Sequence, residues 1–176
     1  MENTALVIID VQAAMFMGNE KPYRGQEVLE SIGLLLDKAR ETGLPVIFVQ
    51  HNDDDEFKKD TAPWQVCPEI APLDGEARVD KTTRDSFYIT ELDDILRRLG
   101  VKTIIFCGMQ TEYCVDTTCR RAYTLGYEAY LASDGHTTFS SKVLPAERII
   151  AHHNNVLPTK FLKVKTTGEL LKLMGT

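Results

Sequence analysis

The stretch that decides the fold is Ala5-Leu-Val-Ile-Ile-Asp10, five apolar residues, three of them β-branched, that end on a carboxylate. A short run that is apolar on both faces is typical of a strand buried in a parallel sheet. Three further runs of this kind follow along the chain, at Val46–Val49, Thr103–Phe106 and Ala129–Ala132. The sequence therefore predicts four buried parallel strands, of which Ala5–Ile9 is the first.

Segments of helical length and period separate these strands. Gln26–Thr42 and Glu112–Leu125 each have the length of a surface helix, and apolar side chains also recur at helical spacing through Leu92–Leu99. A glycine follows each of the three segments, as expected of the left-handed residue that commonly ends a helix. These glycines are Gly43, Gly100 and Gly126.

The last part of the chain continues the alternation, with an expected helix at Pro145–Val156, a short strand at Phe161–Val164 and a helix at Thr167–Leu173. Strands that alternate with helices favour right-handed crossovers and a parallel sheet covered on both faces. The sequence predicts an α/β fold, an open doubly wound sheet in a three-layer sandwich, formed by one domain over residues 1–176. In such a fold the functional site lies at the carboxyl ends of the strands.

Composition and charge limit the classes of partner. The formal net charge is −6 and the sequence pI is about 5.2, so no basic surface is expected that would neutralise the phosphates of a nucleic acid. No run approaches the ~20 apolar residues that span a bilayer, and the first residues lack the basic start of a signal peptide. We expect a cytoplasmic protein that contacts neither nucleic acid nor membrane, with its four cysteines as reduced thiols.

The segment Cys107-Gly-Met-Gln-Thr-Glu-Tyr-Cys114 connects a predicted buried strand to a predicted amphipathic helix. Thr111 is a suitable N-cap, which places Cys114 at the third helical position. There the positive end of the helix dipole favours a thiolate, so we expect a lowered pKa and take Cys114 as the candidate nucleophile. The alternative is that Cys114 packs as a small apolar residue, the role expected of Cys107 and Cys119.

Two charged residues stand at the ends of predicted strands. Asp10 closes the first apolar run, where a buried carboxylate needs a partner, although an Asp in this place often caps the following turn. Lys81 follows Arg78-Val79-Asp80, a short candidate strand, and taken alone has the features of an ordinary surface lysine. The residue pattern by itself leaves both interpretations open.

Three segments, in order along Leu6–Phe139, resemble the isochorismatase-like cysteine hydrolases. Ala5-Leu-Val-Ile-Ile-Asp10-Val-Gln12 is similar to the opening strand of that family. Asp80-Lys81-Thr-Thr-Arg-Asp-Ser-Phe87 is similar to its lysine segment, and Gly108–Tyr127 contains the G-x-x-T-x-x-C-V-x-x-T spacing of its nucleophile segment. The resemblance implies a six-stranded parallel sheet of order 3-2-1-4-5-6.

The same resemblance implies a catalytic triad of Asp10, Lys81 and Cys114 that cleaves a C–N bond of a small amide-type molecule. Cys114 would form a thioester, Asp10 would carry the proton, and Lys81 would supply positive charge. The resemblance further implies a cis peptide bond between Met109 and Gln110, and an oxyanion hole made by the backbone N–H groups of Gln110 and Cys114. It also implies a homo-oligomer, a dimer or larger.

Departures from the family pattern bear on cofactor and substrate. Nicotinamidases of the family carry an Asp and several His residues after the second strand to hold a metal, whereas Gln50–Asp55 contains a single histidine, His51. We therefore expect no metal and no cofactor, and a polar loop role for His51. By analogy, five aromatic side chains would line a pocket for a flat small-molecule substrate: Phe16, Tyr23, Trp64, Phe87 and Tyr113.

Other functions fit part of the sequence. A vinyl ether hydrolase of the isochorismatase type does not need a cysteine, so Cys114 argues against it. A papain-like pair of Cys114 and His136 would leave the segments of Asp10 and Lys81 without a role. A non-catalytic binding or assembly module of the same fold is the remaining alternative, because a fold does not by itself establish an activity.

Overall fold

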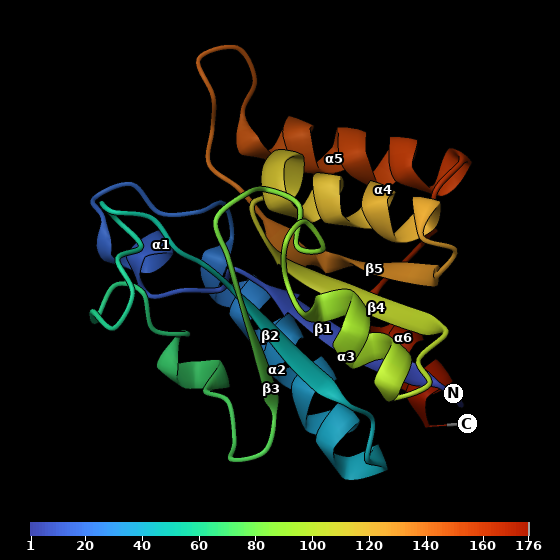
Figure 1. The fold of residues 1–176 in the computed structure, drawn as a ribbon. Coiled ribbons are helices and arrows are strands. Elements are labelled where there is room, and N and C mark those ends of the chain that lie inside the picture. Colours follow the sequence, from blue (N-terminus) through green and yellow to red (C-terminus); the bar gives the residue numbers. More distant parts are fainter. Residues whose placement is uncertain (176) are drawn as a thin grey trace.

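A six-stranded parallel sheet forms the centre of the computed structural model, which describes residues 1–175 (Figure 1). Its order is β3-β2-β1-β4-β5-β6, and all neighbouring strands run parallel. The predicted fold class and strand order are therefore confirmed. The strands are β1 (Thr4–Ile9), β2 (Val46–His51), β3 (Ala77–Lys81), β4 (Thr103–Met109), β5 (Glu128–Thr137) and β6 (Lys163–Lys165).

Helices cover both faces of the sheet, as the alternation of elements predicts (Figure 1). The α-helices are α1 (Ala14–Met17), α2 (Gly25–Thr42), α3 (Leu92–Arg98), α4 (Asp116–Thr124), α5 (Ala146–Val156) and α6 (Thr167–Met174). Short turns of other helix types are η1 (Pro68–Ile70), η2 (Thr111–Val115) and η3 (Leu157–Thr159). The predicted helix ends at Gly43, Gly100 and Gly126 all have positive φ.

The central strand β1 divides the core into two clusters. Ala5, Val7 and Ile9 contact buried residues of α3 and α4 on one face, whereas Leu6 and Ile8 contact those of α2 and α6 on the other. Successive side chains of a strand point to opposite faces, so a strand buried on both sides must be apolar at every position. This explains why the opening run shows no alternation of apolar and polar residues.

β4 lies so close to β1 that its carboxyl end requires a glycine. Gly108 has φ of 128°, and a Cβ atom placed there would lie 2.1 Å from the carbonyl oxygen of Ile9. No side chain fits at that distance, and the left-handed φ also favours glycine. This close approach brings the segment after β4 next to Asp10.

The C-terminal strands differ from the predicted ranges. β5 continues five residues beyond Ala132 to Thr137, because a register shift between Phe106 and Gly108 lets His136 pair with Gly108. The polar run Ser133–His136 carries no apolar pattern, which is why this extension escapes the sequence. β6 begins at Lys163, two residues later than expected. Among the helices formed by residues 1–175, none combines the length and apolarity needed to cross a bilayer.

Candidate active site

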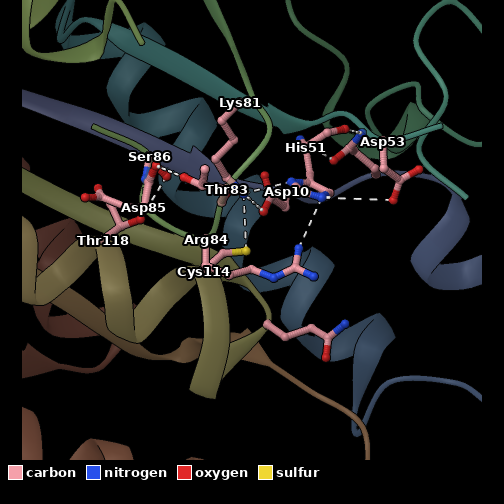
Figure 2. A network of polar contacts seen from close by, with 12 residues as sticks. Asp10, His51, Asp53, Lys81, Thr83, Arg84, Asp85, Ser86, Cys114 and Thr118 are labelled. Atoms are coloured by element: carbon pink, nitrogen blue, oxygen red, sulfur yellow. Dashed lines mark hydrogen bonds and ion pairs between the residues drawn. The ribbon is translucent and has the colours of Figure 1, made fainter. Parts of the chain in front are cut away.

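Three predicted site residues meet where β1, β3 and β4 end (Figure 2). Asp10 directly follows β1 with φ of 50°, a left-handed conformation that Asp tolerates better than most residues. Lys81 is the last residue of β3, and Cys114 lies in η2, which follows β4 after one residue. Parallel strands present their carboxyl ends at one edge, so residues far apart in the chain are brought together there.

Lys81 is the centre of this cluster. Its Nζ lies 2.6 Å from Oδ2 of Asp10, 3.2 Å from Sγ of Cys114 and 3.0 Å from the carbonyl oxygen of Thr83. The side chains of Lys81 and Asp10 are 0% and 1% exposed, so each charge is stable there only because the other is present. Oδ1 of Asp10 accepts no hydrogen bond from residues 1–175, which leaves it free to take a proton.

The nucleophile segment begins with a π-helical turn, η2, and this corrects the predicted helix start. Gln110, in extended conformation, precedes the turn, and its carbonyl oxygen accepts from the N–H groups of Tyr113 and Val115. Thr111 is therefore not the N-cap; its hydroxyl instead contacts Nδ1 of His136 at 2.8 Å. The peptide bond between Met109 and Gln110 is cis.

A cavity of about 390 Å³ opens beside the cluster. Of the five aromatic residues predicted for the pocket, Tyr113 lines this cavity, while Phe16 and Tyr23 line two other cavities. Trp64 is buried behind Met15 and Phe57, and Phe87 stacks on Tyr127 in the core. These four side chains therefore do not line this cavity, because their direction depends on the paths of the loops. The cavity lining is Asp10, Met15, His51, Asp53, Glu56, Phe57, Arg84, Gln110, Tyr113 and Cys114.

Comparison with known proteins identifies the family of this chain. Residues 4–147 match the model of the isochorismatase domain. This chain belongs to the isochorismatase family. The isochorismatase family protein YddQ of Bacillus subtilis (strain 168) is 31% identical, with 96% of this chain and 99% of that protein covered. The crystal structure of a putative isochorismatase hydrolase from Oleispira antarctica has a TM-score of 0.91 at 32% identity, with 98% of each chain covered.

Relatives with named activities are hydrolases of small molecules. A streptothricin hydrolase of Streptomyces noursei is 35% identical over 80% of this chain and 57% of its own length. Nicotinamidase 3 of Arabidopsis thaliana is 28% identical over 79% of this chain and 75% of its own length. The chain is an isochorismatase-family hydrolase.

The expected lowering of the Cys114 pKa is wrong for this isochorismatase-family hydrolase. The pKa of the Cys114 thiol is raised to about 12, mainly by burial and also by the charge of Asp10, while the charge of Lys81 acts in the opposite direction. Lys81 is already paired with Asp10, so its positive charge does not act on the sulfur alone. The resting site therefore holds a neutral thiol beside a buried ion pair, and deprotonation has to accompany the reaction.

His51 and Arg84 are polar residues of the cavity to which the sequence analysis gave no role in the site. His51 is the last residue of β2 and is buried, so it is not a loop residue as expected. Its Nδ1 lies 3.5 Å from Nζ of Lys81 and its Nε2 lies 3.1 Å from Nη1 of Arg84. The sequence did contain a signal for His51. If the predicted second strand is extended by two residues, it ends at His51, at the carboxyl edge of the sheet. Arg84 had none beyond its distance of three residues from Lys81.

His136, the proposed partner of Cys114 in the papain-like alternative, serves a different group. Its Nδ1 faces the hydroxyl of Thr111, and its Nε2 lies 2.9 Å from Oδ1 of Asn154. The amide of Asn154 in turn donates to the carbonyl oxygen of Ser133 at 3.0 Å. Both ring nitrogens are thus occupied by partners other than the cysteine, which rules out the papain-like pair.

The acidic run after β2 forms a turn. Oδ1 of Asp53 accepts from the N–H groups of Asp55 and Phe57 at 2.9 and 2.7 Å, and its Oδ2 lies 4.0 Å from Nε2 of His51. Within the described residues 1–175, no three His, Cys, Asp or Glu side chains are grouped as a metal would require. Metal independence stays a prediction, tested below.

Proposed function

We propose that this isochorismatase-family hydrolase cleaves a C–N bond of a small amide-type substrate through a thioester on Cys114. The observation that carries the proposal is the contact of Lys81 Nζ with both Asp10, at 2.6 Å, and Cys114 Sγ, at 3.2 Å, beside an open cavity. A thiol, a carboxylate with one free oxygen and a buried ammonium together supply a nucleophile, a base and a compensating charge.

In the first half of the reaction, Oδ1 of Asp10 takes the thiol proton as Sγ of Cys114 attacks the carbonyl carbon of the amide. A tetrahedral intermediate forms, with its oxyanion facing the backbone N–H groups of Gln110 and Cys114. Asp10 then returns the proton to the leaving nitrogen. The C–N bond breaks, ammonia or an amine leaves, and the acyl group remains on sulfur as a thioester.

In the second half, Asp10 takes a proton from water, and the resulting hydroxide attacks the thioester carbonyl. The C–S bond breaks, the sulfur takes the proton back from Asp10, and a carboxylic acid is released. Lys81 keeps its charge throughout. It stabilises the Asp10 carboxylate in the resting state and the thiolate while the proton resides on Asp10.

The names of relatives support the choice of an amide-type substrate. Nicotinamidase 3 acts, by its name, on an amide, and the alignment covers 79% of this chain and 75% of that protein. Cys114 itself favours a covalent mechanism over vinyl ether hydrolysis.

The experiment compares Cys114→Ala and Cys114→Ser with the wild type across a panel of small amides, ureas and carbamates, with released ammonia or amine as the readout. Both variants should lose turnover while circular dichroism shows a folded protein. Cys119→Ala is the matched control, since Cys119 is a buried thiol in α4 that belongs to the core. Hydrolysis at the wild-type rate by purified Cys114→Ala contradicts the proposal.

A further inference from the structure

Arg84 is a cation of the catalytic cavity that no carboxylate of the described residues contacts directly. It lines the cavity together with Gln110, Tyr113 and Cys114, and its side chain remains accessible to solvent. Within residues 1–175, no carboxylate oxygen lies within 4.0 Å of its guanidinium. Its one side-chain hydrogen-bond partner there is Nε2 of His51, at 3.1 Å (Figure 2).

His51 is a weak partner for a guanidinium. Burial and the charge of Lys81 lower the pKa of His51, so its ring is neutral and has one N–H group and one acceptor nitrogen. Two cationic donors face the ring, Lys81 at Nδ1 and Arg84 at Nε2. The ring can accept from only one of them, and the guanidinium has five N–H groups to satisfy. Most donors of Arg84 are therefore left for another group.

The backbone around Arg84 is held in place on both sides. The carbonyl oxygen of Thr83 accepts from Nζ of Lys81 at 3.0 Å. The N–H group of Ser86 donates to Oγ1 of Thr118 at 3.1 Å, and that hydroxyl donates to Oγ of Ser86 at 2.8 Å. Arg84 is thus tied to a catalytic residue before it and to α4 after it, which fixes the direction from which its side chain enters the cavity.

We propose that Arg84 binds a carboxylate of the substrate, so that the substrate class is small amides carrying a second, anionic group. The inference rests on the proposed function for the identity of the reacting bond. A guanidinium and a carboxylate are both planar and pair through two parallel hydrogen bonds, which orients as well as holds the ligand. A cavity of about 390 Å³ suits a small molecule of this kind.

Two acids line the same cavity and would repel a carboxylate placed near them. Asp53 uses one oxygen to hold its own turn, and Glu56 is exposed. Asp53 is also a neighbour of the guanidinium, because its Oδ2 and Nη1 of Arg84 approach the same ring nitrogen of His51, at 4.0 and 3.1 Å. The charge of Arg84 therefore favours a carboxylate at the guanidinium, and the charges of Asp53 and Glu56 oppose it. A cationic amide bound by Asp53 and Glu56 is the competing outcome of the test.

The experiment measures kcat/KM for succinamate, neutral butyramide and cationic 3-aminopropanamide in the wild type and in Arg84→Gln, with malonamate and glutaramate to vary the spacing. For the preferred carboxylate, Arg84→Gln should lower kcat/KM roughly 10- to 100-fold, mainly through KM, as expected for losing hydrogen bonds between charged groups. The loss for butyramide, which carries no carboxylate, should be much smaller than the loss for the carboxylate amide. Arg98→Gln, at the end of α3 and outside the cavity lining, is the control and should change neither.

A binding measurement separates this inference from the proposed reaction. Calorimetry on Cys114→Ala should show that the carboxylate amide binds, and that Arg84→Gln in the same background removes binding. If amides bind through Arg84 but none is hydrolysed, the anion site stands and the proposed function fails. The anion site is overturned if butyramide or 3-aminopropanamide is preferred over every carboxylate tested, or if Arg84→Gln affects charged and neutral amides equally.

Discussion

Two buried histidines, His51 and His136, stand in opposite electrostatic situations in this hydrolase. His136 has its two ring nitrogens matched to Thr111 and Asn154, at 2.8 and 2.9 Å. His51 has a cationic donor on each nitrogen, Lys81 at 3.5 Å and Arg84 at 3.1 Å. Burial is the largest cause of the lowered pKa of both rings.

The difference separates a structural use of a buried polar group from a functional one. A fully partnered ring fixes the packing of β5 against η2 and α5, and has no capacity left for a ligand. A ring between two cations leaves hydrogen-bonding capacity unused at the edge of the cavity. Buried polar groups that are incompletely matched call for an explanation, and here a ligand in the cavity provides one. The experiments below test that contrast in order of expected effect.

The largest effect is expected next to His51, where Lys81 forms the buried ion pair with Asp10. Lys81→Met leaves Asp10 buried and uncompensated, so the free energy of unfolding should fall by about 3–5 kcal/mol and turnover should be lost. Urea denaturation and kcat/KM measure the two effects. Asp10→Asn combined with Lys81→Met should recover stability relative to Lys81→Met, because no isolated charge remains. Since the residues act as one unit, the double variant should turn over little more slowly than the worse single variant.

If the losses of Asp10→Asn and Lys81→Met in kcat/KM simply multiply, the two residues act independently and Lys81 is not part of a catalytic unit. If Lys81→Met unfolds at the same urea concentration as wild type, the buried ion pair described here does not govern stability.

The titration of His136 is expected to make the stability of the protein depend on pH. Burial lowers the pKa of His136 to about 4, below the value of about 6.5 in an unfolded chain. The unfolded state therefore binds the proton first as pH falls, and stability should decline from pH 6.5 towards pH 4 by roughly 3 kcal/mol. His51 contributes in the same direction. Urea denaturation at several pH values in this range should show that the free energy of unfolding depends less on pH in His136→Gln than in wild type. An equal pH dependence in the two proteins would contradict the assignment.

A smaller effect follows from comparing the two rings directly at pH 7. His136→Gln removes two matched hydrogen bonds and should lower the free energy of unfolding by roughly 2–3 kcal/mol. His51→Gln should change it by about 1 kcal/mol or less, because the ring accepts from only one of its two cationic donors and at most one hydrogen bond is lost. Thermal unfolding of the two variants gives the ranking. A greater destabilisation by His51→Gln would show that its contacts with Lys81 and Arg84 support the fold.

No effect is expected from chelators. Within residues 1–175, one carboxylate lies within 4.0 Å of the His51 ring, that of Asp53, and this is fewer ligands than a zinc site uses. Dialysis against EDTA should therefore leave kcat/KM for any hydrolysed amide unchanged. Activity lost in EDTA and restored by zinc, iron or manganese would mean that the segment Gln50–Asp55 had been misinterpreted.

Much of the fold and the nucleophile segment could be predicted, because local patterns carry that information. Apolar runs define buried strands and glycines end the helices, so β1, β2 and β4 begin within one residue of their expected starts, although β2 and β4 continue two and three residues beyond their expected ends. The extension of β5 to Thr137 could not be predicted, since pairing with β4 stabilises a polar stretch. Four of the five aromatic residues expected in the pocket do not line this cavity, for a related reason. Side chains on long loops take their direction from neighbours far away in the chain.

The sequence by itself determined the α/β order of elements and, through three motifs, that Asp10, Lys81 and Cys114 should be considered together. Only the tertiary structure decided what surrounds them. It placed His51 and Arg84 at the cavity, assigned His136 to Thr111 and Asn154, and reversed the expected direction of the Cys114 pKa shift. The physical reason is that burial and partner charges come from segments separated by tens of residues, whereas a local pattern records only which face of an element is apolar.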